Sequence, residues 1–202
     1  MKRRRSRYTF PRVFIAASAL VVVMVIFCIF PLSAASEESV AVKFDQDGNL
    51  IRPEGYRMWP YVGAVVTPND LNDGKAPFPE FHSIYIDPQS FAAYQKTGKF
   101  PDGTVMIKEL ISVGAKKAAS GNGYFMGDFI GLEAEIKDSK RFPKEPGYWA
   151  YFSFTEPGKP YKAKAKAAPT AACNTCHEQN AADDWVFTQY YPVLRAAPAK
   201  GK

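Results

Sequence analysis

The run Cys173-Asn174-Thr175-Cys176-His177 constrains this chain more than any other feature of its sequence. It has the C-x-x-C-H spacing of a c-type haem attachment sequence, in which two thiols bond to the haem vinyl groups and the histidine binds the iron. One short helical turn must present both sulfurs and the imidazole to a single flat ring. The sequence therefore predicts one covalent haem c per chain, attached through Cys173 and Cys176, with His177 as the iron ligand.

Two other kinds of site share part of this pattern. A thioredoxin-like redox motif also contains C-x-x-C, and so does half of a zinc site. A zinc site needs two further Cys or His ligands, and Cys28 and His82 are the only such residues outside the run. A redox motif usually lies near the start of a βαβ unit, whereas this one lies near the C-terminus. The pattern favours haem attachment and leaves both alternatives open.

The N-terminus has the organisation of an export signal. Six basic residues lie between positions 2 and 12, an apolar run covers residues 14–30, and the small residues Ser33 and Ala35 follow. This order predicts a signal peptide over residues 1–35, cleaved after Ala35, and a single exported domain over residues 36–202. An uncleaved membrane anchor is the alternative, because the apolar run approaches the shortest length that can span a bilayer.

The charge balance changes once this segment is set apart. The whole chain has 26 basic and 20 acidic residues, and residues 1–35 hold six of the basic and none of the acidic ones. The remainder carries 20 of each, so the apparent basicity gives no support for a nucleic-acid partner. Cys28 lies in the apolar run, and the two other cysteines belong to the C-x-x-C-H run. No disulfide is therefore predicted within one mature chain.

The rest of the chain is dominated by predicted strands. An extended arm is expected over residues 36–55, a turn at Gly121-Asn122-Gly123 and a surface connection over residues 156–168. A helix is predicted over residues 88–97, with Asp87 as its N-cap and Gly98 after its end. The predicted strands cover residues 59–66, 78–87, 105–113, 124–136 and 147–155. The fold class is α+β, a predominantly antiparallel β-sheet with short helices and a haem-binding C-terminal helix, and a four-helix bundle is disfavoured.

The strand over residues 105–113 contains a lysine in an apolar setting. Alternation places Glu109 on one face, with Val105, Ile107, Ile111 and Val113. Lys108 lies on the other face, between Met106 and Leu110. Taken alone, the pattern favours a lysine that snorkels or protects a sheet edge.

Several other residues are given structural interpretations. His82 alternates with Ile84 and Ile86, which favours a hydrogen-bonded sheet histidine over a sixth iron ligand. The methionines Met58, Met106 and Met126 are expected to pack in the core rather than to bind iron. The aromatic residues of the last strand are expected in the core or a dimer interface, and Asp183-Asp184 is a candidate cap for the last helix.

Long motifs in this chain resemble the cytochrome P-460 family. They span residues 67–78, Asp102-Gly103-Thr104, Lys108-Glu109-Leu110, residues 120–128, the Cys173–His177 run and residues 186–195. The resemblance extends through nearly all of residues 36–202. It implies a small periplasmic mono-haem protein that is mainly β and usually a homodimer.

The resemblance also implies a site chemistry. It implies that His177 is the proximal ligand, that the opposite position on the iron is open, and that Lys108 forms a covalent bond from its nitrogen to a meso carbon of the haem. Family members with this cross-link oxidise hydroxylamine to nitrous oxide, with nitric oxide as a further ligand and a soluble redox partner, here expected to be another cytochrome c. The resemblance thus reverses the snorkelling interpretation of Lys108.

One position departs from the active pattern. Hydroxylamine-oxidising members that resemble this chain carry a glutamate a few residues before the first haem cysteine, and Ala168 stands there. An alanine cannot accept a proton, which puts turnover in doubt and leaves haem and ligand binding intact. Three hypotheses remain: a hydroxylamine-oxidising enzyme, a nitric-oxide or gas-ligand-binding protein like the β-sheet cytochromes c′, and a plain electron carrier.

Overall fold

A computed structural model of the chain describes residues 42–159 and 161–198. All of them belong to the unit Ser36–Lys202, whereas the predicted export signal lies outside the described residues. The strands are β1 (Leu50–Ile51), β2 (Tyr61–Val66), β3 (Phe81–Ile86), β4 (Val105–Val113), β5 (Lys117–Ala118), β6 (Gly121–Asn122), β7 (Met126–Lys137), β8 (Trp149–Ser153) and β9 (Lys164–Ala165). The α-helices are α1 (Pro88–Thr97), α2 (Thr170–Asn180) and α3 (Pro192–Ala196), with short 3-10 turns at Tyr56–Met58, Asn69–Leu71, Pro146–Tyr148 and Thr188–Tyr190.

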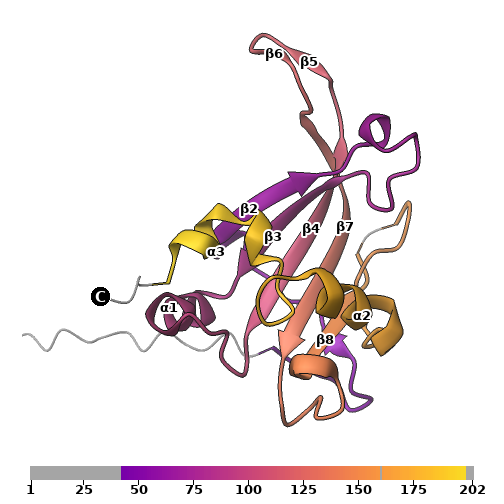
Figure 1. The fold of residues 1–202 in the computed structure, drawn as a ribbon. Coiled ribbons are helices and arrows are strands. Elements are labelled where there is room, and N and C mark those ends of the chain that lie inside the picture. The colour runs from indigo at the N-terminus through magenta and orange to yellow at the C-terminus, as the bar shows by residue number, and fades with distance from the viewer. Residues whose placement is uncertain (1–41, 160, 199–202) are drawn as a thin grey trace, which may run out of the picture. The chain divides into compact units, whose positions relative to one another are not determined.

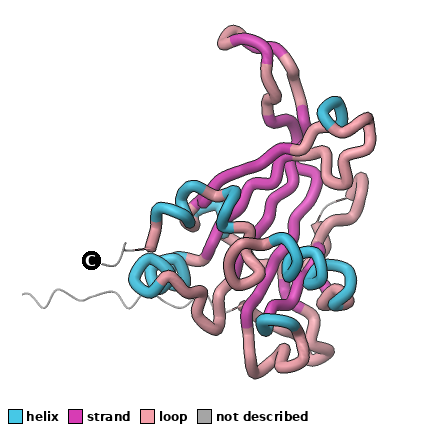
Figure 2. The backbone as a smooth tube through the Cα atoms, viewed as in Figure 1, coloured by secondary structure: helices cyan, strands magenta, loops and turns pink. Residues whose placement is uncertain are grey.

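The centre of the fold is a five-stranded antiparallel sheet in the order β2-β3-β4-β7-β8 (Figure 1). Each neighbouring pair is antiparallel, so the predicted α+β class with a predominantly antiparallel sheet is confirmed. The three α-helices lie on one side of the sheet (Figure 2). Among the described residues, no helix is both long and apolar enough to cross a bilayer.

The two faces of the sheet have separate cores. We call one the Glu109 face, because Glu109 shares it with the buried residues Val105, Ile107, Leu132 and Phe152. We call the other the Lys108 face, which carries Met106, Trp149 and Tyr151 and packs against Val186 and Leu194 from the C-terminal segment. The alternation predicted for residues 105–113 is therefore confirmed.

Helix α1 forms where the sequence predicted it. The Asp87 side chain accepts a hydrogen bond from Ser90 N at 2.8 Å, and Pro88 occupies the first helical position. Gly98 adopts a left-handed conformation (φ 68°) that ends the helix. The second carboxylate oxygen of Asp87 accepts from Val105 N at 2.9 Å, so the cap also ties the helix to β4.

Other boundaries differ from the predictions. β2 begins at Tyr61 and β3 at Phe81, each later than expected, because Pro60 and Pro79 precede them and proline cannot donate to a ladder. Gly121 and Asn122 form β6 instead of a turn, and they pair with β5 to close a hairpin. The expected connection over residues 156–168 contains β9, whose pairing with β1 buries Ala165.

Candidate functional site

Helix α2 carries the C-x-x-C-H run and is anchored to the sheet from within it. Asn174, the residue after the first cysteine, is 1% exposed, and its side-chain amide donates to Trp149 O at 2.9 Å. This bond ties α2 to the start of β8. Cys173 is half-buried against the Lys108 face, Cys176 is exposed, and both are free thiols. The helix therefore brings two unpaired thiols to the edge of that face.

The imidazole of His177 is held in one orientation. Its Nδ1 lies 2.7 Å from Trp185 O, and its ring packs between Tyr151 and Phe187, with centroids 4.5 and 4.7 Å away. A carbonyl oxygen can only accept a hydrogen bond, so Nδ1 carries the proton and Nε2 keeps its lone pair. Burial lowers the pKa of His177, which keeps the ring neutral at pH 7. A neutral imidazole with a free Nε2 is the form that binds a metal.

Lys108 lies on the same side of the sheet as α2. Its Nζ is 2.9 Å from Glu133 Oε2, a residue directly opposite it on β7, and 4.6 Å from the centroid of the Phe78 ring. The lysine and glutamate side chains are 27% and 32% exposed, so both remain accessible. Burial is the main reason for the lowered pKa of His177, and the positive charge of Lys108 adds to it. The structure thus brings Lys108 and His177 together on one face.

A second carboxyl group on β7 contacts the histidine. Glu135 Oε2 lies 3.7 Å from His177 Nδ1. Burial raises the pKa of Glu135 to about 8, while the charge of Lys108 opposes this change. Glu135 is therefore largely neutral at pH 7, which lowers the cost of keeping it beside the imidazole.

Ala168 lies close to this group of residues. It is half-buried at the edge of the Lys108-face core, where Cys173 also packs. Its backbone N donates to Tyr151 O at 2.7 Å, and the Tyr151 ring contacts His177. Ala168 is therefore held next to the Tyr151 backbone on the Lys108 face, and its methyl group is not a proton acceptor.

Three expectations from the sequence are wrong in whole or in part. His82 Nε2 is buried and has no hydrogen-bond partner among the described residues, so this is not a fully satisfied sheet histidine. Burial, with the charge of Lys108, lowers the pKa of His82 to about 4. Met106 is 1% exposed as expected for the core, but Met58 and Met126 are 88% and 48% exposed. Asp183 and Asp184 do not cap the last helix, which begins after Tyr191.

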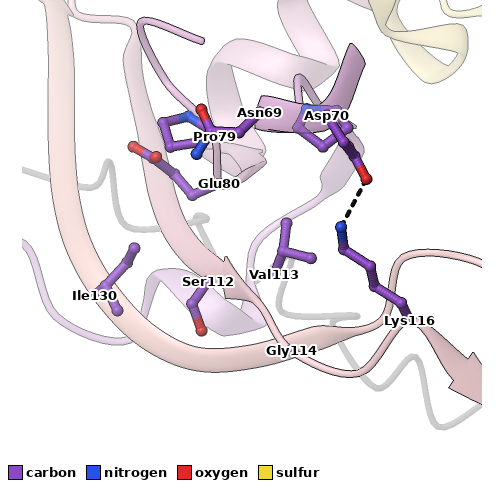
Figure 3. A pocket seen from close by; sticks show the side chains of 10 residues that line it. Asn69, Asp70, Pro79, Glu80, Ser112, Val113, Gly114, Lys116 and Ile130 are labelled. Carbon is purple, nitrogen blue, oxygen red and sulfur yellow. Dashed lines mark hydrogen bonds and ion pairs between the residues drawn. The ribbon is translucent and has the colours of Figure 1, made fainter. Parts of the chain in front are cut away.

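The motifs over residues 67–78 and 120–128 meet away from these residues, at the base of the β5–β6 hairpin. There Lys116 Nζ and Asp70 Oδ2 point toward each other and are 2.6 Å apart (Figure 3). Tyr124 donates to the other oxygen of Asp70 at 3.0 Å. These contacts line an open hollow of about 310 Å³ that also includes Glu80 and Ser112. The hollow contains none of the predicted site residues, so we attribute to this part of the motif the role of fastening the hairpin to the sheet.

Comparison with known proteins decides the family. A family model described as Cytochrome P460 matches residues 53–188, which is more than half of the chain and includes both Lys108 and the C-x-x-C-H run. The chain belongs to the cytochrome P460 family. As a member, this cytochrome P460 is a haem protein and binds iron through that haem. A search of curated proteins finds no match.

The residues on the Lys108 face fit a haem. Four buried side-chain polar atoms lack a hydrogen-bond partner in the described part of this cytochrome P460. Two belong to Tyr151 and Trp185, which contact His177, and a third belongs to His82, which is close enough to Lys108 for the charge to lower its pKa. A buried polar group without a partner costs on the order of 1–3 kcal/mol, so a cluster of them indicates a missing polar ligand. Among the described residues, no group of three or more His, Cys, Asp or Glu side chains is arranged as a metal cage.

Sequence reasoning missed two contributors to this site and could not place a third. Glu133 is a visible acid on the long strand, but alternation alone does not show that it reaches the site. Glu135 was missed, because the register between β4 and β7 decides which acidic residues lie near Lys108. Trp185 was missed because it acts through its backbone carbonyl, which has no side-chain signature. Alternation along β7 could have shown that both glutamates share one face of the sheet. It could not have shown that this face is the one that carries Lys108.

Proposed function

We propose that this cytochrome P460 holds its haem at three points and binds the iron at a fourth. Cys173 and Cys176 form the thioethers, Lys108 Nζ bonds to a meso carbon of the ring, and His177 Nε2 is the iron ligand. The observation that carries this proposal is the placement of all four residues on one side of the sheet, with His177 kept neutral and its Nδ1 already occupied.

We further propose that the protein binds hydroxylamine and oxidises it. The bound haem supplies a redox-active iron with one position open to a small nitrogen ligand. Two hydroxylamine molecules give one nitrous oxide and one water, releasing four protons and four electrons. The electrons go to a soluble one-electron acceptor of the cytochrome c type, and the protons require an acceptor in the protein.

Glu133 is the proton acceptor that this site supports best. Its carboxylate is hydrogen bonded to Lys108 at 2.9 Å and is 32% exposed, so it can pass a proton to water. A bond between Lys108 and the haem removes the ammonium charge of the lysine, which leaves Glu133 beside the ring without its cation. Glu133 would then take the role that a glutamate at position 168 has in the active pattern. It stands at a different position of the chain, on β7, so we expect slow turnover.

A nitric-oxide or gas-ligand-binding function, like that of the β-sheet cytochromes c′, is the second candidate. Ala168 favours it, because an alanine leaves ligand binding intact and supplies no proton acceptor at the position where the active pattern has a glutamate. The plain electron carrier has less support, since Met58 and Met126 are exposed and Met106 lies in the core.

Anaerobic turnover of hydroxylamine with a one-electron oxidant separates these functions. We expect the native protein to bind hydroxylamine and to oxidise it slowly. Ala168→Glu should raise the rate, because a positioned general base contributes on the order of 10²–10⁴-fold. Ala167→Glu is the matched control, since Ala167 is exposed and one residue away. Brisk native turnover that neither Ala168→Glu nor Glu133→Gln changes would contradict the proposal.

Two proposals concern the cellular context. We infer that residues 1–35 direct export to the periplasm, which N-terminal sequencing of the mature protein would test.

We also infer a homodimer, because residues 126–130 of β7 are exposed and include Met126, Phe129 and Ile130, an arrangement suited to contact with a second copy. Phe129→Glu should shift the mass in light scattering to that of a monomer, and an unchanged mass would contradict this interface.

A further inference from the structure

The segment after α2 contains a turn with an uncommon backbone. Asp183 and Val186 form an isolated antiparallel bridge, and Val186 N donates to Asp183 O at 2.7 Å. The two residues between them, Asp184 and Trp185, have φ values of 45° and 61°. Turns with two positive φ values are normally built from glycine and asparagine. An ordinary side chain in this conformation is strained, because its Cβ lies too close to the following carbonyl oxygen.

Neighbouring residues hold the turn in place from two directions. Asp184 Oδ2 lies 2.6 Å from Lys137 Nζ at the end of β7, and Asp184 Oδ1 accepts from Trp149 Nε1 at 3.4 Å. The Lys137 and Asp184 side chains are only 16% and 22% exposed. On the other side, the Trp185 indole packs directly over Gly147, where an added Cβ would lie 2.4 Å from Cε3.

The turn delivers one group to the predicted iron ligand. The carbonyl of Trp185 is the acceptor 2.7 Å from His177 Nδ1. We propose that the Asp184–Trp185 turn is a positioning device for His177, in which the Lys137–Asp184 ion pair holds the strained backbone and the Trp185 carbonyl thereby holds Nδ1–H. This inference rests on the proposed role of His177 as the axial ligand.

The physical consequence concerns the donor strength of the imidazole. A hydrogen bond from Nδ1–H makes the ring a stronger donor at Nε2, which stabilises the ferric state over the ferrous state. Strained conformations persist only where surrounding contacts enforce them. Loss of the ion pair should therefore let the turn relax, lengthen the Nδ1–H to carbonyl bond and raise the reduction potential of the haem.

The test compares Asp184→Ala with two other variants of the haem-loaded protein. Asp184→Asn keeps a residue that tolerates positive φ but removes the charge. Asp70→Ala is the matched control, because it breaks a Lys–Asp ion pair of the same 2.6 Å length at the hairpin base. The measurements are the reduction potential by spectroelectrochemistry and the iron–histidine stretching frequency of the ferrous protein by resonance Raman spectroscopy.

We expect Asp184→Ala to raise the ratio of reduced to oxidised haem at least tenfold at a fixed potential, which corresponds to about 59 mV for a one-electron couple. The iron–histidine frequency should fall. Asp184→Asn should show a smaller change of the same sign, and Asp70→Ala none. An unchanged or lower potential in Asp184→Ala would overturn the inference. If Asp184→Ala does not load haem, Lys137→Met breaks the same ion pair from the β7 side. Its reduction potential should then rise by the same amount, and an unchanged or lower potential would overturn the inference.

A separate variant distinguishes this inference from the proposed function. His177→Gly should lose the iron–histidine band, and added imidazole should restore a band. Retention of the native band in His177→Gly would overturn the axial assignment and the inference with it. Loss of the band in His177→Gly, together with no change in Asp184→Ala or Lys137→Met, would overturn only the role of the turn.

Discussion

Two neighbouring residues of β4 face opposite sides of the same sheet and have opposite surroundings. Glu109 has a side chain that is 1% exposed, and both of its oxygens have partners. Its Oε1 accepts from the Tyr56 hydroxyl and from Arg57 Nη2, each at 2.5 Å, and its Oε2 accepts from Arg57 Nε at 3.4 Å. Lys108 is 27% exposed, and its partner Glu133 is 32% exposed. The carboxylate on one face is enclosed and satisfied, whereas the ion pair on the other is open.

The unsatisfied polar atoms are distributed in the same way. His82, Tyr151 and Trp185 each have a buried polar atom without a partner, and all three pack on the Lys108 side. On the Glu109 side, Tyr161 has the one such atom among the described residues. A face that is closed and satisfied stabilises a fold, and a face with unmet donors is suited to a ligand. In the proposed function, the alternation of β4 thus puts the stabilising carboxylate on one face of the sheet and the haem on the other.

The largest effect on stability is expected on the Glu109 face. Arg57→Met leaves a buried carboxylate without its cation and should lower the free energy of unfolding by about 3 kcal/mol. Urea unfolding monitored by circular dichroism measures this change. The double variant Arg57→Met/Glu109→Leu should recover most of the loss, because it removes the uncompensated charge as well. A single variant as stable as the native protein would show that Glu109 is not as enclosed as described.

A pH dependence of stability is expected from the Lys108 face. Burial, aided by the charge of Lys108, lowers the pKa of His82 to about 4, below its value of about 6.5 in the unfolded chain. The unfolded chain therefore takes up a proton between these pH values that the folded chain does not. Neutral His82 therefore contributes up to roughly 3 kcal/mol to the free energy of unfolding at neutral pH. This contribution is lost as the pH falls from about 6.5 to about 4. Glu135 and His177 also titrate differently in the folded and unfolded chains, so the test compares the haem-free native chain with His82→Gln. The difference in free energy of unfolding between the two chains should change across this pH range as stated, and a difference that does not depend on pH would contradict the burial of His82.

The smallest effect on stability is expected at the open ion pair itself. Lys108→Met should change the free energy of unfolding of the haem-free chain by less than about 1 kcal/mol, because partly exposed ion pairs contribute little. The same substitution should change the absorption spectrum of the haem-loaded protein to that of an ordinary haem c. Arg57→Met should instead lower the free energy of unfolding and leave the absorption spectrum of the haem-loaded protein unaltered. A large loss of stability in Lys108→Met would mean that Lys108 is a structural residue, as the pattern of the strand alone suggested.

Local signals predicted the fold better than they predicted the site. Helix α1 and strand β4 have their predicted bounds, because a proline, a cap and a C-terminal glycine mark the helix and alternation marks the strand. The C-x-x-C-H run could also be recognised from the sequence, because it is a local pattern. The partners of Lys108 and His177 could not be recognised, because they depend on the long-range register of the sheet and on a backbone carbonyl. The Asp184–Trp185 turn contains no glycine or asparagine, so its sequence does not indicate a turn.

The central claim is that Lys108 and the C-x-x-C-H run hold one haem between them. Proteolysis of the haem-loaded protein followed by tandem mass spectrometry tests it directly. The account predicts one haem-containing species in which the peptide with Cys173 and Cys176 and the peptide with Lys108 are joined through the same ring. Recovery of the Lys108 peptide unmodified, with haem on the cysteine peptide alone, would contradict it.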